Sequence, residues 1–469
     1  MDFVNYLEVF FSKHFPDKSY IVGGWCRDKL LNKNPKDIDI VIEEENGAER
    51  ACILLSELDN VSYYKVGNSY PIYKVYFKEY NETIDIADSQ KEYFPDTNSR
   101  QRLTKYASLR EDSLRRDFTI NKIYYNLTTK KYLSFCNGIK DLENKIITCD
   151  NNPNKMFSND PLRIIRMCRF SIKYDFTIDD YILQSAYSNI DRLNIISKER
   201  IQEELIKICN CSKGLYKFLI NFESIFLYIF PWYENLQNIL QHPSLTINDI
   251  RNIHLEGKYV SDHIKLCLYN MPDDYKGIIQ LAILFHDIGK LKTRSIKDNK
   301  CRFINHENVG VYLAEEELSK LKFSNKDIKT ICMCIKYHMR LHEYNLKTDK
   351  SVRKLIREVN EYLDIILKVS EIDKLSCIKE KQESDFNILK DKIYNIKNNM
   401  KEPLISGDDI FNIYNESPSE IIGLVKKACL DLQDNYNFNK DKLIIFLKQY
   451  KHSQDFLSKY KKDVDKINI

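Results

Sequence analysis

The stretch YIVGGWCRDKLLNKNPKDIDIVI, residues 20–42, decides how the rest of the chain is interpreted. Its second half, KDIDIVI, predicts a β-strand in which Asp37 and Asp39 share one face and the isoleucines point into a core. Two carboxylates this close repel each other, and a divalent cation relieves the repulsion while it also binds phosphate oxygens. We therefore expect Mg²⁺ to be bound by this pair of aspartates.

The first half of the stretch predicts a phosphate site. Gly23 and Gly24 follow the strand-like run YIV and precede the helix-like run WCRDKLL. Backbone amides and a helix start can face a phosphate there, and Arg27 adds positive charge. A surface strand with two aspartates is common by itself, so it is the fixed order of these elements that favours a functional cleft.

The order GGxxRD followed by DxD resembles the nucleotidyltransferase superfamily, specifically the tRNA nucleotidyltransferase and bacterial poly(A) polymerase family. ETIDIADSQKEYF, residues 82–94, is similar to the family's third-carboxylate strand and offers Asp85 as a possible additional acid. The arginine usually found after that strand is Gln90 here.

A second matching string is SLREDSLRRDFTINKIYYN, residues 108–126, which contains the family's RRDFTIN signature. Arg115 and Arg116 can offer forked donors to a triphosphate. Asp117 and Asn121 can hydrogen-bond ribose hydroxyls. An ordinary salt bridge at a helix start would explain Asp117, but it would not explain the whole string.

The segment NDPLRIIRMCRFSIKYDF, residues 159–176, combines a helix-start signal with a basic stripe. Asp160 before proline predicts an N-cap, and capping alone is a common role for such an aspartate. Arg163, Arg166 and Arg169 recur every three residues, which places three guanidinium groups along one side of a helix where they can hold one polyanion.

Asp160 and Arg163 also predict base selection. Cytosine and adenine both present an amino donor beside a ring-nitrogen acceptor, whereas uracil and guanine present the reverse order. A carboxylate and a guanidinium in fixed register would accept CTP and ATP and leave unpaired groups against UTP and GTP. The segment resembles the family's base-reading motif EDxxRxxRxxRF, with Asn159 in place of the usual glutamate.

A separate pattern of histidines and aspartates predicts a second site. Metal ligation by neutral imidazole and carboxylate suits Mn, Fe, Ni or Mg. The candidate ligands are His263, His286, Asp287 and Asp373, with His306 and His338 for a second metal position. The strings HDIGKLKTRS, NHENVG and KYH resemble the HD phosphohydrolase superfamily, which implies metal-dependent hydrolysis of phosphate esters. The alternative is a domain that survives only as a fold, with histidines capping helices.

With 469 residues the chain is too long for a single core. Alternating apolar runs predict a mixed sheet with helices up to about residue 150, and helical periodicity predominates after it, so the fold class is α+β. The predicted domains are a nucleotidyltransferase head (1–153), a helical neck that reads bases and binds RNA (154–230), an HD domain (231–380) and a helical tail that binds tRNA (381–469).

Charge and cysteine usage narrow the partners and the compartment. The net charge is only +4, but residues 97–131 hold nine Lys/Arg against three Asp/Glu, which predicts a polyanionic partner at chosen places. The 13 cysteines include no CxxC and indicate reduced thiols. There is no membrane-length apolar run and no targeting signal, so we expect a cytoplasmic protein.

The combined resemblance, from about residue 20 to residue 450, implies stepwise addition of CMP, CMP and AMP to the 3′ end of tRNA from CTP and ATP, with release of pyrophosphate and without a template. It also implies Mg²⁺ in the head and a divalent transition metal or Mg²⁺ in the HD site. A poly(A) polymerase or a partial CC- or A-adding enzyme would share these strings and differ mainly in a loop, here residues 94–108. Other interpretations are an HD phosphohydrolase that binds RNA and a pure RNA-binding protein.

Overall fold

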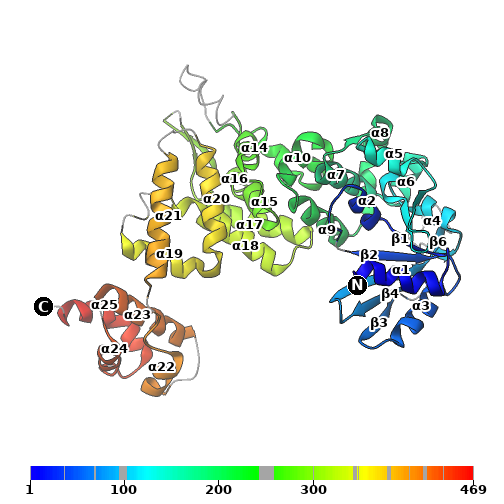
Figure 1. Ribbon diagram of the computed structural model, residues 1–469. Coiled ribbons are helices and arrows are strands. Elements are labelled where there is room, and N and C mark those ends of the chain that lie inside the picture. The colour runs from blue at the N-terminus through cyan, green and yellow to red at the C-terminus, as the bar shows by residue number, and fades with distance from the viewer. Residues whose placement is uncertain are drawn as a thin grey trace. The chain divides into compact units, whose positions relative to one another are not determined.

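The computed structural model contains two compact units, described separately here (Figure 1). The first comprises Met1–Gln241, Tyr259–Leu284 and Ala314–Ile328, and the second includes Phe285–Leu313 and Lys329–Ile469. The structure describes residues 2–35, 37–67, 70–93, 103–241, 258–298, 300–341, 346, 348–377, 382–400, 402–415, 420–436 and 438–467. The predicted loop at 94–108 lies largely outside these residues. The division into four domains stays a prediction.

The first unit begins with a seven-stranded mixed sheet in the order β3-β4-β5-β2-β1-β8-β9. Its strands are β1 (Ser19–Val22), β2 (Ile38–Ile42), β3 (Val61–Val66), β4 (Ile72–Phe77), β5 (Glu82–Asp88), β8 (Ile123–Asn126) and β9 (Tyr132–Ser134). The β2–β5 pair is parallel, and the other pairs of this sheet are antiparallel. The sheet followed by helices confirms the α+β class.

One face of this sheet is packed under two helices. Phe77 of β4 contacts Phe3 of α1 (Phe3–His14), with 5.1 Å between the ring centroids. Helix α3 (Gly47–Ser56) contacts β3, β4 and β5 and buries Ala51 and Leu55. The strand residues beneath them are buried because their alternation places every second apolar side chain on this face. The opposite face of β2, β5 and β4 is left for polar groups.

The apolar runs that predicted strands correspond to observed ones: YIVGG to β1, DIDIVI to β2, YPIYKVYF to β4, ETIDIA to β5, INKIYYNL to β8 and KYLSF to β9. Strand β3 was not predicted, because its sequence VSYYKV shows no alternation of buried and polar residues. The reason is physical: β3 is an edge strand, and its residues after Val61 are exposed on both faces.

Helices make up the remainder of the first unit. Before residue 153 these are α2 (Gly24–Leu30), α4 (Leu109–Arg115), η1 (Thr119–Asn121) and α5 (Gly138–Glu143), with the hairpin β6 (Gln90–Tyr93) and β7 (Leu103–Tyr106). Then follow α6 (Pro153–Asn159), α7 (Leu162–Tyr174), α8 (Asp180–Ser188), η2 (Ile190–Ile195), α9 (Lys198–Cys209), α10 (Gly214–Asn221), α11 (Glu223–Ile229), α12 (Trp232–Leu236), α14 (Val260–Asn270) and α15 (Ile278–Phe285). The short strands β10 (Ile146–Ile147) and β11 (Thr177–Ile178) pair in parallel.

From residue 286 onward the chain is mainly helical, as predicted. The helices are α16 (Lys290–Thr293), α17 (His306–Lys320), α18 (Asn325–Tyr337), η3 (His338–Leu341), α19 (Asp349–Val359), η5 (Asn360–Tyr362), α20 (Leu363–Leu375), α21 (Gln382–Asn398), α22 (Gly407–Tyr414), α23 (Glu420–Tyr436), α24 (Lys440–Leu447) and α25 (Ser453–Ile467). An unpredicted hairpin, β12 (Arg294–Lys297) and β13 (Lys300–Phe303), interrupts them. Among the described helices, none has the length and apolar character that a membrane crossing requires.

The predicted N-cap at Asp160 is wrong. Helix α7 begins at Leu162 with Pro161 as its N-cap residue, and no side chain caps this end. Asp160 instead terminates α6 as its C-cap residue, and its carboxylate lies 3.3 Å from a guanidinium nitrogen of Arg200. The proline starts the helix through its fixed φ, which leaves the aspartate free of capping duty.

Candidate functional site

Three carboxylates occupy the open face of the sheet. Asp37 precedes β2 and is exposed, Asp39 lies within β2, and the parallel register places Asp85 of β5 directly beside Asp39. Both oxygens of Asp85 accept hydrogen bonds from Lys74 Nζ, at 2.7 and 2.8 Å. Lys74 therefore compensates the third carboxylate, and the negative charge of Asp37 and Asp39 remains to be balanced by another cation.

The environment of Asp39 shows this imbalance. The Asp39 carboxylate is partly open to solvent, but desolvation by the surrounding protein raises its pKa. The negative charge of the neighbouring Asp85 raises it further. Arg116 opposes the rise. Oxygen-only donors near one another at the mouth of a cleft are the set that Mg²⁺ prefers, so the residues fit the predicted cation.

The glycine turn between β1 and α2 lies beside these carboxylates. Gly23 has a φ of 69°, a left-handed conformation that favours glycine, and it precedes the first residue of α2. Val22 of β1 pairs with Asp39 of β2, which places the turn at the same edge as the carboxylate. The sequence correctly predicted this strand–turn–helix unit.

Arg27 of α2 is held inside the wall of the cleft. Its guanidinium donates to Asp28 at 2.9 Å and to Asn121 Oδ1 at 2.5 Å, and it lies 4.7 Å from the centre of the Tyr174 ring. Only 6% of its side chain is exposed. These contacts make Arg27 a link between α2, η1 and α7, and its predicted contribution of positive charge to a phosphate site stays a prediction.

Asp112 organises the two arginines that were predicted to bind the triphosphate. Its buried carboxylate accepts from Arg115 Nε at 2.8 Å and from Arg116 Nε at 2.9 Å. Burial alone would raise the pKa of Asp112, but Arg116 and Arg115 outweigh it and hold that pKa below its usual range. We did not single out Asp112 from the sequence, although its spacing of three and four residues from the arginines is a recognisable helical pairing signal.

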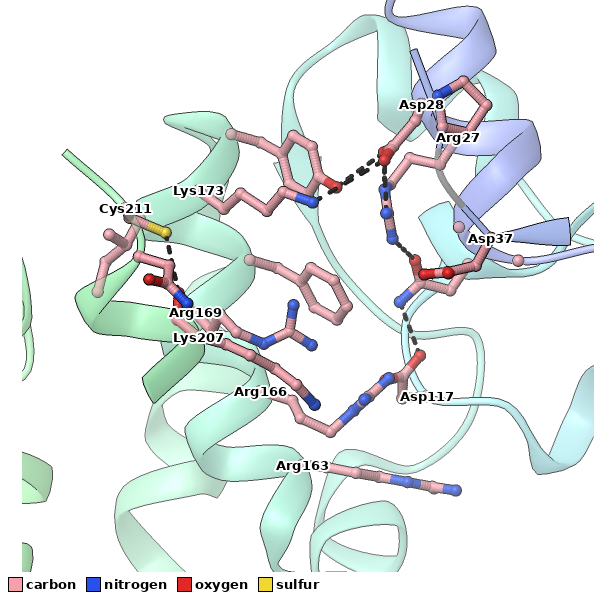
Figure 2. A pocket seen from close by; sticks show the side chains of 18 of the residues that line it. Arg27, Asp28, Asp37, Asp117, Arg163, Arg166, Arg169, Lys173, Lys207 and Cys211 are labelled. Carbon is pink, nitrogen blue, oxygen red and sulfur yellow. Dashed lines mark hydrogen bonds and ion pairs between the residues drawn. The ribbon is translucent and has the colours of Figure 1, made fainter. Parts of the chain in front are cut away.

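Asp117 joins the RRDFTIN segment to α7 (Figure 2). Its Oδ1 accepts from Asn121 Nδ2 at 2.8 Å, and its Oδ2 accepts two hydrogen bonds from Arg166 at 2.8 and 2.5 Å. Burial would raise the pKa of Asp117, but Arg166 and Asn121 together hold it far below the usual range. Both predicted ribose contacts, Asp117 and Asn121, are therefore bonded to each other in this structure.

The three arginines of α7 project from one helix, but each has a different partner. Arg163 donates to the backbone oxygen of Arg115 at 2.6 Å, and Arg166 binds Asp117. Arg169 binds Glu204 of α9 at 2.6 Å. Glu204 is buried and was not predicted as a site residue. The three arginines therefore form a stripe along α7, and each is held in place by a different partner in the cleft wall.

A cleft of about 1090 Å³ in the first unit is lined by all thirteen residues predicted for the transfer site. Twelve Lys and Arg against six Asp line it, so its potential is strongly positive. Lys173 and Lys207 line the cleft near Cys211 (Figure 2), and Lys217 and Lys276 are also among its lining residues. Burial lowers the pKa of Lys173, and the nearby positive charges of Arg27 and Arg169 lower it further. Asp28 raises this pKa but does not outweigh them. Such a surplus of cations is suited to several phosphates.

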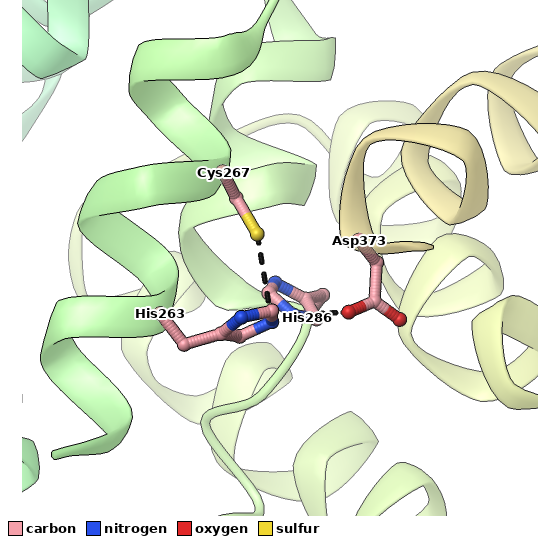
Figure 3. A group of neighbouring side chains, drawn as sticks. All are labelled: His263, Cys267, His286 and Asp373. Atoms are coloured by element: carbon pink, nitrogen blue, oxygen red, sulfur yellow. Dashed lines mark hydrogen bonds and ion pairs between the residues drawn. The ribbon is translucent and has the colours of Figure 1, made fainter. Parts of the chain in front are cut away.

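The predicted ligands of the second site gather into two groups. His263, Cys267, His286 and Asp373 form one group, whose potential ligand atoms lie within 4.8 Å of one another (Figure 3). Cys267 was not predicted. Its sulfur lies 3.5 Å from His263 Nε2, one helical turn away in α14, so helical spacing from His263 was the available signal.

The second group consists of Asp287, His306 and His338, again within 4.8 Å. Backbone oxygens of Phe303 and Ile335 lie 2.8 and 2.6 Å from the Nδ1 atoms of His306 and His338, which turns both Nε2 atoms toward Asp287. Burial lowers the pKa of His338 to about 3, so its imidazole is neutral, as metal ligation requires. Together the groups provide two sets of residues that can hold a metal.

Comparison with known proteins agrees with this geometry. The family described as "Poly A polymerase head domain" matches residues 19–148, and the HD domain family matches residues 249–376. Each of these two families matches a separate part of the chain. This result confirms the resemblances to the two families that the sequence indicated.

Three relatives define the range of similarity. The tRNA nucleotidyltransferase cca1 of Schizosaccharomyces pombe is 34% identical over 41% of this chain, and the match spans 42% of that protein's length. The mitochondrial CCA tRNA nucleotidyltransferase of Candida glabrata is 24% identical over 91% of this chain and 90% of the relative. Poly(A) polymerase I of Escherichia coli is 29% identical over 61% of this chain and 64% of the relative. Because one relative is mitochondrial, the cytoplasmic location stays a prediction.

Solved structures share the fold. The CCA-adding enzyme of Bacillus stearothermophilus in complex with CTP superposes with a TM-score of 0.59, at 17% identity and over 95% of this chain and 97% of that one. The Thermotoga maritima CCA-adding enzyme complexed with tRNA gives a TM-score of 0.54 at 19% identity, over 94% of both chains.

The Asp117 network yields a prediction about stability. Replacing Asp117 by Asn removes the charge that compensates Arg166, so we expect the free energy of unfolding to fall by about 1–2 kcal/mol at neutral pH, less than for a fully buried pair because Arg166 is partly exposed. The folded-state pKa of Asp117 is lowered, so the wild-type advantage is present above the unfolded value, about 3.9, and decreases as the pH falls below it.

Urea unfolding followed by tryptophan fluorescence at pH 7 and at about pH 3.5 measures this difference. Both tryptophans, Trp25 and Trp232, belong to the first unit and are buried, so the signal reports the unit that contains Asp117. An equal deficit of the variant at the two pH values would contradict the assigned ionisation.

Proposed function

We propose that this protein adds CMP, CMP and AMP to the 3′ end of tRNA, using CTP and ATP and releasing pyrophosphate. The observation that supports this most is the pairing of exposed Asp37 and Asp39 with a cleft lined by twelve cations. A carboxylate pair that binds a cation, placed next to an excess of guanidinium groups, fits nucleotidyl transfer and not simple RNA binding. The tRNA nucleotidyltransferases among the relatives support the same activity.

Different residues of the chain take different roles in the proposed transfer reaction. Asp37 and Asp39 would hold Mg²⁺, which would supply Lewis-acid activation of the primer 3′-hydroxyl and positive charge for the triphosphate. The 3′-oxygen attacks the α-phosphorus, a new phosphodiester bond forms, and the bond to the pyrophosphate breaks. Arg115 and Arg116, held by Asp112, lie where they can take up the charge of the departing pyrophosphate.

Base selection is assigned to Asp160 and Arg163. Both line the cleft, and neither is used to cap α7. In this structure Asp160 is paired with Arg200 and Arg163 with a backbone oxygen, so each must exchange a partner when a base arrives. We propose that the carboxylate accepts from the amino group shared by cytosine and adenine and that the guanidinium donates to the adjacent ring nitrogen.

The product distinguishes this activity from its close alternatives. The E. coli relative is a poly(A) polymerase, and partial CC- or A-adding enzymes would use the same head residues. A tRNA that lacks its 3′ CCA, incubated with Mg²⁺ and CTP, should gain two residues, and with CTP and ATP it should gain three. Asp37→Asn should lower the rate by at least about 100-fold because the cation loses a ligand.

Resolution of the products on a sequencing gel measures both effects, and tRNA binding by Asp37→Asn serves as the control for folding. A long A tail would instead assign the protein to poly(A) synthesis, and addition of a single class of residue would assign it to the partial enzymes.

Arg163 offers a test of base selection. Arg163→Ala should reduce the ratio of kcat/KM for CTP to that for UTP by roughly 10- to 100-fold, because one of the two readout hydrogen bonds is lost. Arg163→Lys keeps the charge without the planar fork and serves as the matched variant. Full selectivity in Arg163→Ala would remove Arg163 from the readout.

We propose a second, hydrolytic activity for the HD domain. It is supported by the two metal-binding groups and by a surface pocket of about 480 Å³ lined by His306, Lys336 and Arg340. The histidines and aspartates would hold one or two divalent metals, and the two cationic side chains would meet the phosphate of an ester. The metal, when bound, would lower the pKa of a water molecule and make it a nucleophile.

Replacing Asp287 by Ala tests this second activity. Elemental analysis of the purified protein should show loss of bound transition metal, and metal-stimulated hydrolysis of a phosphodiester such as bis(p-nitrophenyl) phosphate should disappear. CMP addition to tRNA should be unchanged, because Asp287 does not line the transfer cleft. Unchanged metal content and unchanged hydrolysis in the variant would show that Asp287 holds no metal needed for this activity.

A further inference from the structure

The open face of the sheet continues beyond the catalytic carboxylates. The register places Asp39 beside Asp85, Asp85 beside Lys74, and Lys74 beside Tyr64, in a single row from β2 to the edge strand β3. Neighbouring strands lie about 4.8 Å apart, so Tyr64 is roughly 14 Å from Asp39 along this row. The row connects the site of chemistry to an exposed aromatic side chain.

This extension of the face is apolar and exposed, which is unusual for the edge of a sheet. Tyr64 is 61% exposed, and three further side chains on the same face are about 40% exposed. Edge strands are normally protected by charge or by a covering element, and single exposed apolar residues are commoner than a contiguous group. We name this surface the tyrosine platform; its members are Tyr64, Val66, Ile72 and Tyr76, with Lys74 among them.

The other face of the same strand gives the contrast. Tyr63 points to the side covered by α3, and its ring centroid lies 6.2 Å from that of Tyr73, which is 3% exposed. Tyr63 is 36% exposed and partly packed by these contacts, whereas Tyr64 is 61% exposed. Two adjacent tyrosines of one strand thus differ only in the face to which they point.

The geometry of nucleotidyl transfer indicates what covers the platform. The attacking and leaving oxygens lie roughly in line on opposite sides of the phosphorus. The leaving pyrophosphate belongs on the side of Gly23, Arg115 and Arg116, within the cleft. The attacking 3′-hydroxyl must then approach Asp39 from the opposite side, which is the side of β5, β4 and β3.

We propose that the tyrosine platform binds the single-stranded 3′ end of the RNA primer, with bases stacked on Tyr64 and Tyr76. This inference rests on the proposed transfer function. Stacking on aromatic side chains tolerates any base, which suits an end whose last residue changes from one addition to the next. Lys74 lies between the carboxylates and the tyrosines, where its charge faces the backbone of the last nucleotides.

Steady-state kinetics with a tRNA that lacks CCA tests the proposal. Tyr64→Ala should lower kcat/KM for tRNA by roughly five- to 100-fold and leave the KM for CTP unchanged. Tyr64→Trp should restore most of the loss because it keeps a stacking surface. Tyr63→Ala, on the face of the same strand that is turned toward α3, is the matched control and should leave kcat/KM for tRNA near the wild-type value.

A binding measurement makes the test independent of transfer. With 2-aminopurine as the last residue of the tRNA and no nucleotide present, wild type should quench the fluorescence by stacking, Tyr64→Ala should not, and Tyr64→Trp should. Equal behaviour of Tyr64→Ala and wild type, or of Tyr64→Ala and Tyr63→Ala, would overturn the proposal. A wild-type dimer that becomes a monomer in Tyr64→Ala would also overturn the proposal, because the platform would then bind a second copy of the chain and not RNA. If wild type quenches but adds no CMP, the transfer function fails while the platform stands.

Discussion

A chain of hydrogen bonds from Arg27 through Asn121 and Asp117 to Arg166 is the interaction on which the cleft depends. It joins α2, η1 and α7, three elements that are far apart in the sequence. A buried guanidinium such as that of Arg27 must have its donors satisfied, and these donors reach oxygens only if the three elements lie together. The cost of burying charge therefore specifies how the wall of the cleft is assembled.

This network of hydrogen bonds changes how the sequence motifs are interpreted. GGWCRD, RRDFTIN and DPLRIIRMCRF each suggested an independent contact with the nucleotide. In the structure their charged residues first bind one another, and the surplus of positive charge along the cleft is what remains for a ligand. Arg115 and Arg116 are an example. Each donates its Nε–H to Asp112, and this contact orients the remaining N–H groups of the guanidinium. Preorganised donors of this kind need little rearrangement when charge develops.

Local pattern was sufficient to predict the strand–turn–helix unit, the two aspartates at the start of β2 and the helical character after residue 150. Each of these follows from a period of two or 3.6 and from the turn chemistry of glycine. Partners that meet only through tertiary contact were missed. Glu204 lies 35 residues from Arg169 and has no local signal. Asp85 was indicated only by the family resemblance, because the register that places it beside Asp39 depends on a parallel crossover. Asp160 was assigned to a cap because proline at a helix start normally follows one, whereas here the proline alone begins α7.

Strand β3 was missed for a different reason, and that reason is informative. Sequence patterns detect strands by the difference between a buried and a solvated face, and β3 has no such difference. A strand without a buried face gains little from apolar burial, so Tyr64 and Val66 are not explained by stability of the sheet. Their exposure leaves an aromatic surface in register with Asp85 and Asp39, on the side from which the attacking hydroxyl of the proposed transfer reaction would come. The residues that sequence patterns explain least are therefore those that extend the row of cleft carboxylates to the edge of the sheet.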